Sequence, residues 1–184
     1  MGGQLFLLWR MGSLTPQAAL PLHLCSFNGV IALPVLLSKC SSGWEFMLFL
    51  GLPGALGALL FPCVVGCPWQ GWMNLFFFGL HTLLVLAALL PLMVGMRPRR
   101  CPWGAFLWGN GLVAMAMAAN QRFNGNFLFL QSAPEGTPLA FLHRWGPWGY
   151  WMLLEALAAL ILFAVNPLMS RGLQVLAVKK GKDA

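Results

Sequence analysis

The chain has 184 residues, of which 59% are hydrophobic and only 8% are charged, and its mean hydropathy is +0.76. Soluble domains carry about 25% charged residues, and a soluble chain of this size cannot cover so much apolar surface. These values exclude a water-soluble globular domain and predict an integral membrane protein. The net charge is +7, and the basic residues cluster only around Arg97 and Lys179. Such clusters do not form the folded basic surface that nucleic-acid binding requires, so we expect no nucleic-acid partner.

Five apolar segments are long enough to cross a bilayer as helices, which takes about 20 residues each. They run from Leu20 to Ser38, Trp44 to Gly66, Trp72 to Met96, Pro102 to Ala119 and Trp148 to Pro167. Tryptophans gather near the segment ends, as in an aromatic belt, and no segment shows strand-type alternation. The sequence therefore predicts an all-α membrane protein, with residues 1–184 forming a single transmembrane domain of five helices.

Proline and glycine inside these segments predict local geometry. Proline lacks a backbone N–H and kinks a helix, so we expect kinks at Pro34, Pro53 and Pro91. Small residues let transmembrane helices approach closely, and the residues spaced for such packing are Gly51, Gly54 and Gly57.

Basic residues are shared unevenly between the two sets of segment ends. One set holds Lys39, Arg97, Arg99, Arg100, Arg171, Lys179, Lys180 and Lys182, whereas the other holds Arg10, Arg122 and Arg144. Because cytoplasmic ends carry the excess of lysine and arginine, the first set is predicted to be cytoplasmic. This predicts a multi-pass protein of the cell inner or plasma membrane with its basic tail, residues 170–184, in the cytoplasm.

The first residues do not read as a secretory signal. A short apolar run from Leu5 to Trp9 is followed, not preceded, by a positive charge at Arg10. A signal peptide has the opposite order and a longer apolar region. We interpret residues 1–14 as the remnant of a further helix, so that a full-length form would have six.

Polar side chains from four segments share one depth in the predicted membrane region. Counted at about 1.5 Å per residue from the non-cytoplasmic ends, Asn28 lies about eight residues in, His81 about nine and Glu155 about seven. Cys25 is slightly shallower, and Asn120 closes its segment at the same face. Polar groups at membrane depth are costly and usually face a bundle interior. The shared depth therefore predicts one cavity in the outer half of the bundle.

A thiol and an imidazole at that depth are the minimal pair for covalent catalysis. We predict Cys25 as the nucleophile and His81 as its base, with Asn28 or Asn120 donating to an oxyanion. Glu155 is predicted to orient the imidazole or to hold a lipid headgroup. Structural interpretations stand beside these: Cys25 as a small packing residue, His81 as a helix contact and Glu155 as a hydrogen-bonded structural group.

The sequence contains no evident metal or cofactor motif. Cys63 and Cys67 lie four residues apart without a second ligand pair, which argues against zinc, although a local disulfide between them is conceivable. There is no phosphate-binding loop and no dinucleotide fingerprint. We therefore expect no metal and no cofactor.

Several short motifs, in order along nearly the whole chain, resemble the YwaF-type family of bacterial integral membrane proteins. They are Leu8-Trp9-Arg10, Ala19-Leu20-Pro21-Leu22-His23-Leu24-Cys25, Gly95-Met96-Arg97-Pro98, Asn126-Phe127-Leu128-Phe129-Leu130, Pro134-Glu135-Gly136 and Gly146-Pro147-Trp148. The resemblance implies kinship with a eukaryotic transmembrane acyltransferase that installs polyunsaturated acyl chains on ether phospholipids. The cysteine and histidine taken as catalytic in that relative correspond to Cys25 and His81. The family has a further helix before the Leu-Trp-Arg run, which this chain lacks.

Two functions follow as expectations. The first is lipid acyl transfer or lipid hydrolysis through a thioester, with membrane phospholipid as acyl donor and acceptor. The second is non-enzymatic: a lipid- or solute-binding membrane protein, or a transport subunit, that uses the same polar cavity.

Overall fold

A computed structural model of the chain describes residues 6, 9, 10, 12, 14–62, 70–99, 102–134, 136–169 and 171–172, and all regular elements in these ranges are helical. The predicted all-α class is confirmed. Most of residues 1–14, the Cys63 and Cys67 pair and most of the tail 170–184 lie outside the described residues.

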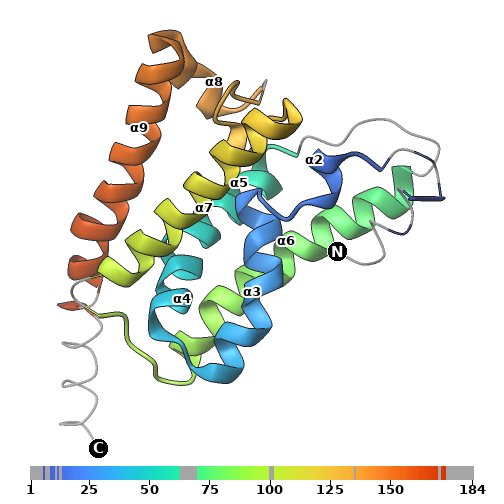
Figure 1. Cartoon of the computed structure of the whole chain (residues 1–184). Coiled ribbons are helices and arrows are strands. Elements are labelled where there is room, and N and C mark those ends of the chain that lie inside the picture. The colour runs from blue at the N-terminus through green and yellow to red at the C-terminus, as the bar shows by residue number, and fades with distance from the viewer. Residues whose placement is uncertain are drawn as a thin grey trace, which may run out of the picture.

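Consecutive long helices run in alternating directions through the bundle (Figure 1). In order, the elements are α2 (Pro16–Ala19), α3 (Leu24–Ser38), α4 (Ser41–Phe46), the π-helix η1 (Met47–Gly51), α5 (Leu52–Leu60), α6 (Gln70–Met93), α7 (Trp103–Phe123), the 3₁₀ turn η2 (Phe127–Phe129), α8 (Pro138–Leu142), the 3₁₀ turn η3 (His143–Trp145), α9 (Gly146–Leu160) and the π-helix η4 (Ile161–Val165). The segments α4, η1 and α5 form one continuous helical rod, and so do α9 and η4.

Four helical stretches of the described chain are long and apolar enough to cross a membrane: Pro16–Ser38, Ser41–Leu60, Gly71–Met93 and Trp148–Met169. They overlap four of the five predicted segments. The fifth predicted segment is also helical, as α7, a helix of 21 residues. Polar residues such as Asn110, Asn120 and Arg122 make α7 less apolar than the other four.

The π-helix η1 has a physical cause in Pro53. A proline ring crowds the carbonyl four residues earlier and offers no N–H, so a regular α-turn cannot continue through it. Immediately before Pro53 the helix widens over Met47–Gly51, where the Leu52 N–H donates to the Met47 carbonyl five residues back. Such a wide turn absorbs the distortion without ending the helix. Pro34 and Pro91 lie inside α3 and α6, as predicted.

One end of the bundle is built around a fully buried carboxylate. The Oε1 atom of Glu45 accepts from the Arg99 backbone N–H at 2.7 Å, and its Oε2 atom accepts from Arg99 Nη2 at 3.0 Å. The Nδ2 atom of Asn166 donates to the Arg99 carbonyl at 2.9 Å. Nearby, the Trp44 indole N–H donates to the Ala88 carbonyl at 2.9 Å. These bonds tie α4 to α6, to the connection between α6 and α7, and to the end of the α9–η4 rod.

The opposite end is closed by the segment that follows α7. Asn120 accepts from the Phe127 backbone N–H at 2.6 Å and donates to the Phe127 carbonyl at 3.2 Å. The Gln17 side-chain oxygen accepts from the Asn126 backbone N–H at 2.8 Å. The chain between α7 and α8 therefore folds back onto α2 and the start of α3.

The charged ends agree with the predicted alternation of the helices. Lys39 follows α3, Arg97 and Arg99 follow α6, and Arg171 follows the α9–η4 rod, so all four belong to the end that holds Glu45. The assignment of this end to the cytoplasm stays a prediction.

Loss of the ion pair should destabilise the bundle. In Arg99→Gln the buried Glu45 carboxylate loses its charged partner, so the unfolding free energy should fall by about 3 kcal/mol; this is the low end for a broken buried pair, because Arg99 is half exposed. The measurement is unfolding in detergent, followed by tryptophan fluorescence. The matched control is Arg97→Gln, an exposed arginine two residues away, which should change little. Equal loss in both variants would contradict a specific role for the pair.

Topology can be checked with reporter fusions. A reporter fused after Lys182 should read as cytoplasmic and one at Ala133 as non-cytoplasmic, because the basic residues favour the end that carries the tail. Paired alkaline phosphatase and fluorescent-protein fusions give the two readouts. Fusions that both read the same side would contradict the alternation.

Candidate functional site

Cys25 and Asn28 lie about one turn apart on α3 and face the same neighbour, the η1–α5 rod. A Cβ atom added at Gly51 would lie 2.8–2.9 Å from the amide atoms of Asn28, and one added at Gly54 would lie 4.0 Å from Cys25 Sγ. The missing side chains therefore let α3 approach η1 and α5 closely. Two of the three glycines predicted to support close packing do so, whereas nothing lies within 4 Å of the equivalent point at Gly57.

His81 lies on the buried face of α6. His81, Leu84 and Ala88 are 8%, 5% and 0% exposed and recur at the spacing of a single helix face. The helices that α6 packs against are α5, α3 and η1. The bond from Trp44 to Ala88 sets the register of the two antiparallel helices. Gly51 lies seven residues after Trp44 and His81 lies seven residues before Ala88, so the two are roughly level.

The tautomer of His81 follows from its hydrogen bond. Its Nδ1 atom lies 2.6 Å from the Phe77 carbonyl oxygen. A carbonyl oxygen can only accept, so Nδ1 carries the proton in the neutral ring and Nε2 carries the lone pair. The Phe77 carbonyl thus orients the imidazole and leaves Nε2 as the nitrogen able to take a proton.

Asn28 is buried, with 1% exposure, and only part of its amide is paired. Its Nδ2 atom donates to the Leu24 carbonyl at 2.8 Å, one turn earlier on α3. Its Oδ1 atom has no hydrogen-bond partner among the described residues. The unpaired oxygen is an acceptor, and the second N–H of Nδ2 is a donor that the bond to Leu24 does not use. The predicted role of Asn28 as a donor to an oxyanion stays a prediction.

The other two predicted residues are engaged elsewhere. Both sides of the Asn120 amide bond the backbone of Phe127, so this residue holds the loop after α7. Glu155 Oε1 accepts from Asn110 Nδ2 at 3.2 Å and so joins α9 to α7. The described hydrogen bond of Glu155 leads to α7 and not to His81.

The loop after α7 covers the start of α3, two residues from Cys25. The His23 ring lies against Phe127 and Phe129, with ring centroids 5.6 and 5.2 Å apart. Leu128 and Phe129 both have φ of 56°, in the left-handed region that non-glycine residues rarely adopt. The bonds from Asn120 and the ring contacts of His23 hold this uncommon backbone in place.

Sequence reasoning missed the ion pair of Glu45 with Arg99. The chain has only four acidic residues, and Glu45 stands inside an apolar segment directly after Trp44. A carboxyl group at membrane depth is costly, and this argument, which was applied to Glu155, could also have singled out Glu45. Its partner, Arg99, was read as a topology signal alone. Within the described ranges, no group of three or more His, Cys, Asp and Glu side chains is arranged to hold a metal ion.

Cys40, between α3 and α4, is a second partly buried thiol with different surroundings. Its Sγ atom lies 3.5 Å from Ser42 Oγ. The pKa of Cys40 is lowered first by this hydroxyl and then by the backbone N–H of Gly43, while burial acts in the opposite direction. Cys40 is therefore the thiol whose thiolate persists to lower pH, at the end of the bundle away from Cys25.

This difference predicts a pH dependence. In a variant that keeps Cys40 as its one cysteine, alkylation by a water-soluble maleimide should begin at lower pH than for an ordinary thiol. Ser42→Ala removes the stabilising hydroxyl, so the pKa should rise, the alkylation profile should shift to higher pH and the rate at pH 7 should fall severalfold. Ser41→Ala is the matched control. An unchanged profile in Ser42→Ala would contradict the assigned cause.

Comparison with known proteins places the chain in one family. No curated protein and no solved structure matches it. The model of the TMEM164 family matches residues 2–166, which is most of the chain. The YwaF-type assignment stays a prediction. Together with the all-helical bundle and its four apolar helices, this match shows that the chain is a multi-pass membrane protein that belongs to the TMEM164 family.

Proposed function

We propose that the protein catalyses lipid acyl transfer through a thioester on Cys25, with His81 as the general base. The observation that carries the proposal is the shared neighbour of the two residues. Cys25 Sγ lies 4.0 Å from the point that a Cβ at Gly54 would occupy, and His81 lies on the face of α6 that packs against the same η1–α5 rod. The Nε2 atom of His81 bears the lone pair that such a base requires.

The reaction proceeds in two steps. In the first, His81 Nε2 takes the thiol proton as Cys25 Sγ attacks the ester carbonyl of a membrane lipid. The C–O bond breaks, the leaving alkoxide takes the proton from His81, and the acyl group stays on sulfur. In the second, His81 takes the proton of an acceptor hydroxyl, whose oxygen attacks the thioester and returns the thiolate, which His81 reprotonates. Water in place of the acceptor alcohol gives lipid hydrolysis.

The surrounding polar residues have supporting roles in this proposal. The unpaired Oδ1 atom of Asn28 suits a hydrogen bond from the thiol or from the acceptor hydroxyl. Asn120 acts through the loop over the start of α3, and Glu155 through the contact between α9 and α7. Donor and acceptor lipids reach the site from the membrane. The proposed steps use neither a metal nor a cofactor.

The competing function is lipid or solute binding without chemistry. It is favoured by one observation: the polar groups of Asn120 and Glu155 are engaged in bonds within the bundle, as structural residues would be. The two functions differ in whether Cys25 reacts.

The decisive experiment uses purified protein in lipid nanodiscs and a thiol-directed acyl probe. We expect hydroxylamine-sensitive labelling that Cys25→Ser abolishes and His81→Ala slows by about 10²–10⁴-fold, the usual contribution of a general base. Labelling is read at Cys25 by peptide mapping, because Cys40 is itself a reactive thiol. Cys40→Ser and Cys101→Ser should leave the labelling of Cys25 unchanged. Labelling of Cys25 at the same rate in His81→Ala would contradict the pair. Absence of Cys25 labelling in a folded protein would favour the binding function.

A further inference from the structure

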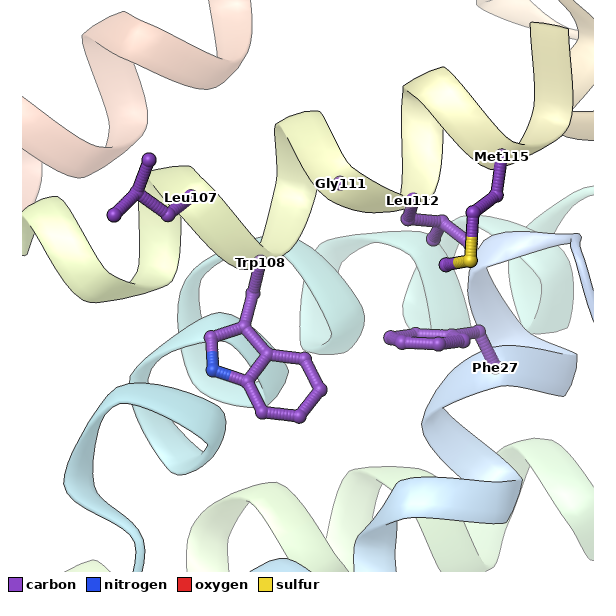
Figure 2. Close-up of a pocket in the computed structure, with 6 residues that line it drawn as sticks. All are labelled: Phe27, Leu107, Trp108, Gly111, Leu112 and Met115. Atoms are coloured by element: carbon purple, nitrogen blue, oxygen red, sulfur yellow. The ribbon is translucent and has the colours of Figure 1, made fainter. Parts of the chain in front are cut away.

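An apolar groove of about 320 Å³ lies between α3 and α7. Figure 2 shows Phe27 of α3 facing Leu112 and Met115 of α7, with Trp108 beside them. The groove is completed by Leu107 and Gly111. The Trp108 indole nitrogen lies on the side of its ring away from Phe27 (Figure 2). No charged side chain lines the groove, so its surface suits hydrocarbon.

The groove is continuous with the lipid-facing surface of the bundle. Leu107 and Met115 on α7 are 68% and 47% exposed, and Val30, one turn from Phe27 on α3, is 50% exposed. Val30 and Phe27 lie on a helical stretch apolar enough to cross a membrane, and α7 packs beside that stretch through the contact of Trp108 with Phe27. The medium around such a stretch is acyl chain and not water. The occupant of a groove that opens onto this surface is therefore drawn from lipid.

The back of the groove is rigid. Phe27, Phe46 and Trp108 form an aromatic cluster with ring centroids 5.9–6.3 Å apart. Phe46 is fully buried, and Leu112 is 1% exposed. The groove is thus a preformed depression against the packed core, which lowers the cost of binding.

Gly111 marks an open part of the groove, as Gly57 on α5 and Gly79 on α6 mark open positions on other helices. Glycine in a helix interior costs about 1 kcal/mol relative to alanine, so its presence calls for a reason. Two other glycines of α7 have one: an added Cβ would lie 2.5 Å from Ser42 Cβ at Gly104 and 3.3 Å from Leu50 Cδ1 at Gly109. At Gly111 nothing lies within 4 Å of that point. Its missing side chain relieves no contact within the described chain and only deepens the groove.

We propose that this groove is a binding site for one acyl chain of a membrane phospholipid. Ligand pockets span about 300–1,000 Å³, so a groove at the lower limit suits a single chain and not a whole lipid. The site is distinct from the pair Cys25 and His81, and it holds whether or not that pair reacts.

The test is photocrosslinking in nanodiscs that contain phosphatidylcholine with a diazirine in one acyl chain. Peptide mapping should place labels on residues 107–115 at higher density than on the exposed face of α6 formed by Leu83, Leu86 and Leu90. Gly111→Leu fills the groove from an open position and favours the helix, so the protein should fold and labelling of 107–115 should fall at least tenfold. The matched control is Gly79→Leu on α6, which also meets open space and should leave that labelling unchanged.

Each alternative has its own outcome. Equal label density on residues 107–115 and on the α6 face would mean that the lipids are only the general annulus, and would overturn the site. Undiminished labelling in a folded Gly111→Leu would also overturn it. If Gly111→Leu unfolds at a lower temperature than the parent protein, Gly111→Phe and Met115→Trp test the same point. They fill the groove with other large side chains, from position 111 and from position 115. Since the readout is crosslinking, failure here leaves the reaction of Cys25 with the acyl probe as a separate question.

Discussion

Burial of the Glu45 carboxylate is the constraint on which the arrangement of the helices depends. A carboxylate removed from water needs a charged partner and further hydrogen bonds, or its desolvation is not offset. Arg99 supplies both its guanidinium and its backbone N–H, and Asn166 in turn binds the Arg99 carbonyl. Residues far apart in sequence must therefore meet at one point. This requirement fixes which helix ends adjoin, a choice that apolar side chains in a lipid environment leave open.

The same end of the bundle determines the geometry of the candidate site. With Trp44 bound to the Ala88 carbonyl, α4 and α6 cannot slide past each other without losing a buried hydrogen bond. The register set there brings Gly51 to roughly the level of His81. Asn28 then packs against Gly51 from the third helix. A polar contact at one membrane face thus controls the relative height of residues in the opposite half.

The sequence was sufficient for the helices but only in part for the site. Run length and hydropathy predicted the apolar crossings because both are local properties, although α5 ends at Leu60 and not near Gly66. Depth, counted along each segment, grouped Cys25, Asn28 and His81, and that grouping stays a prediction. It could not separate them from Glu155, because depth is one coordinate and the direction around the helix axis is another. That direction is set by partners such as Asn110, which lies 45 residues away in sequence.

The two faces of α3 give the proposed site and the proposed groove different tasks. Cys25 lies on the side of α3 near Gly54 of α5, whereas Phe27, two residues later, faces α7 and packs against Trp108 with the two rings tilted by 56°. Residues two apart on a helix point in nearly opposite directions and differ in depth by only about 3 Å. A chain held against Phe27 is therefore at the depth of the thiol but on the wrong side of the helix to react with it. If both sites operate, the groove holds a chain that anchors a lipid, and the acyl group that reaches Cys25 approaches along α5 and α6.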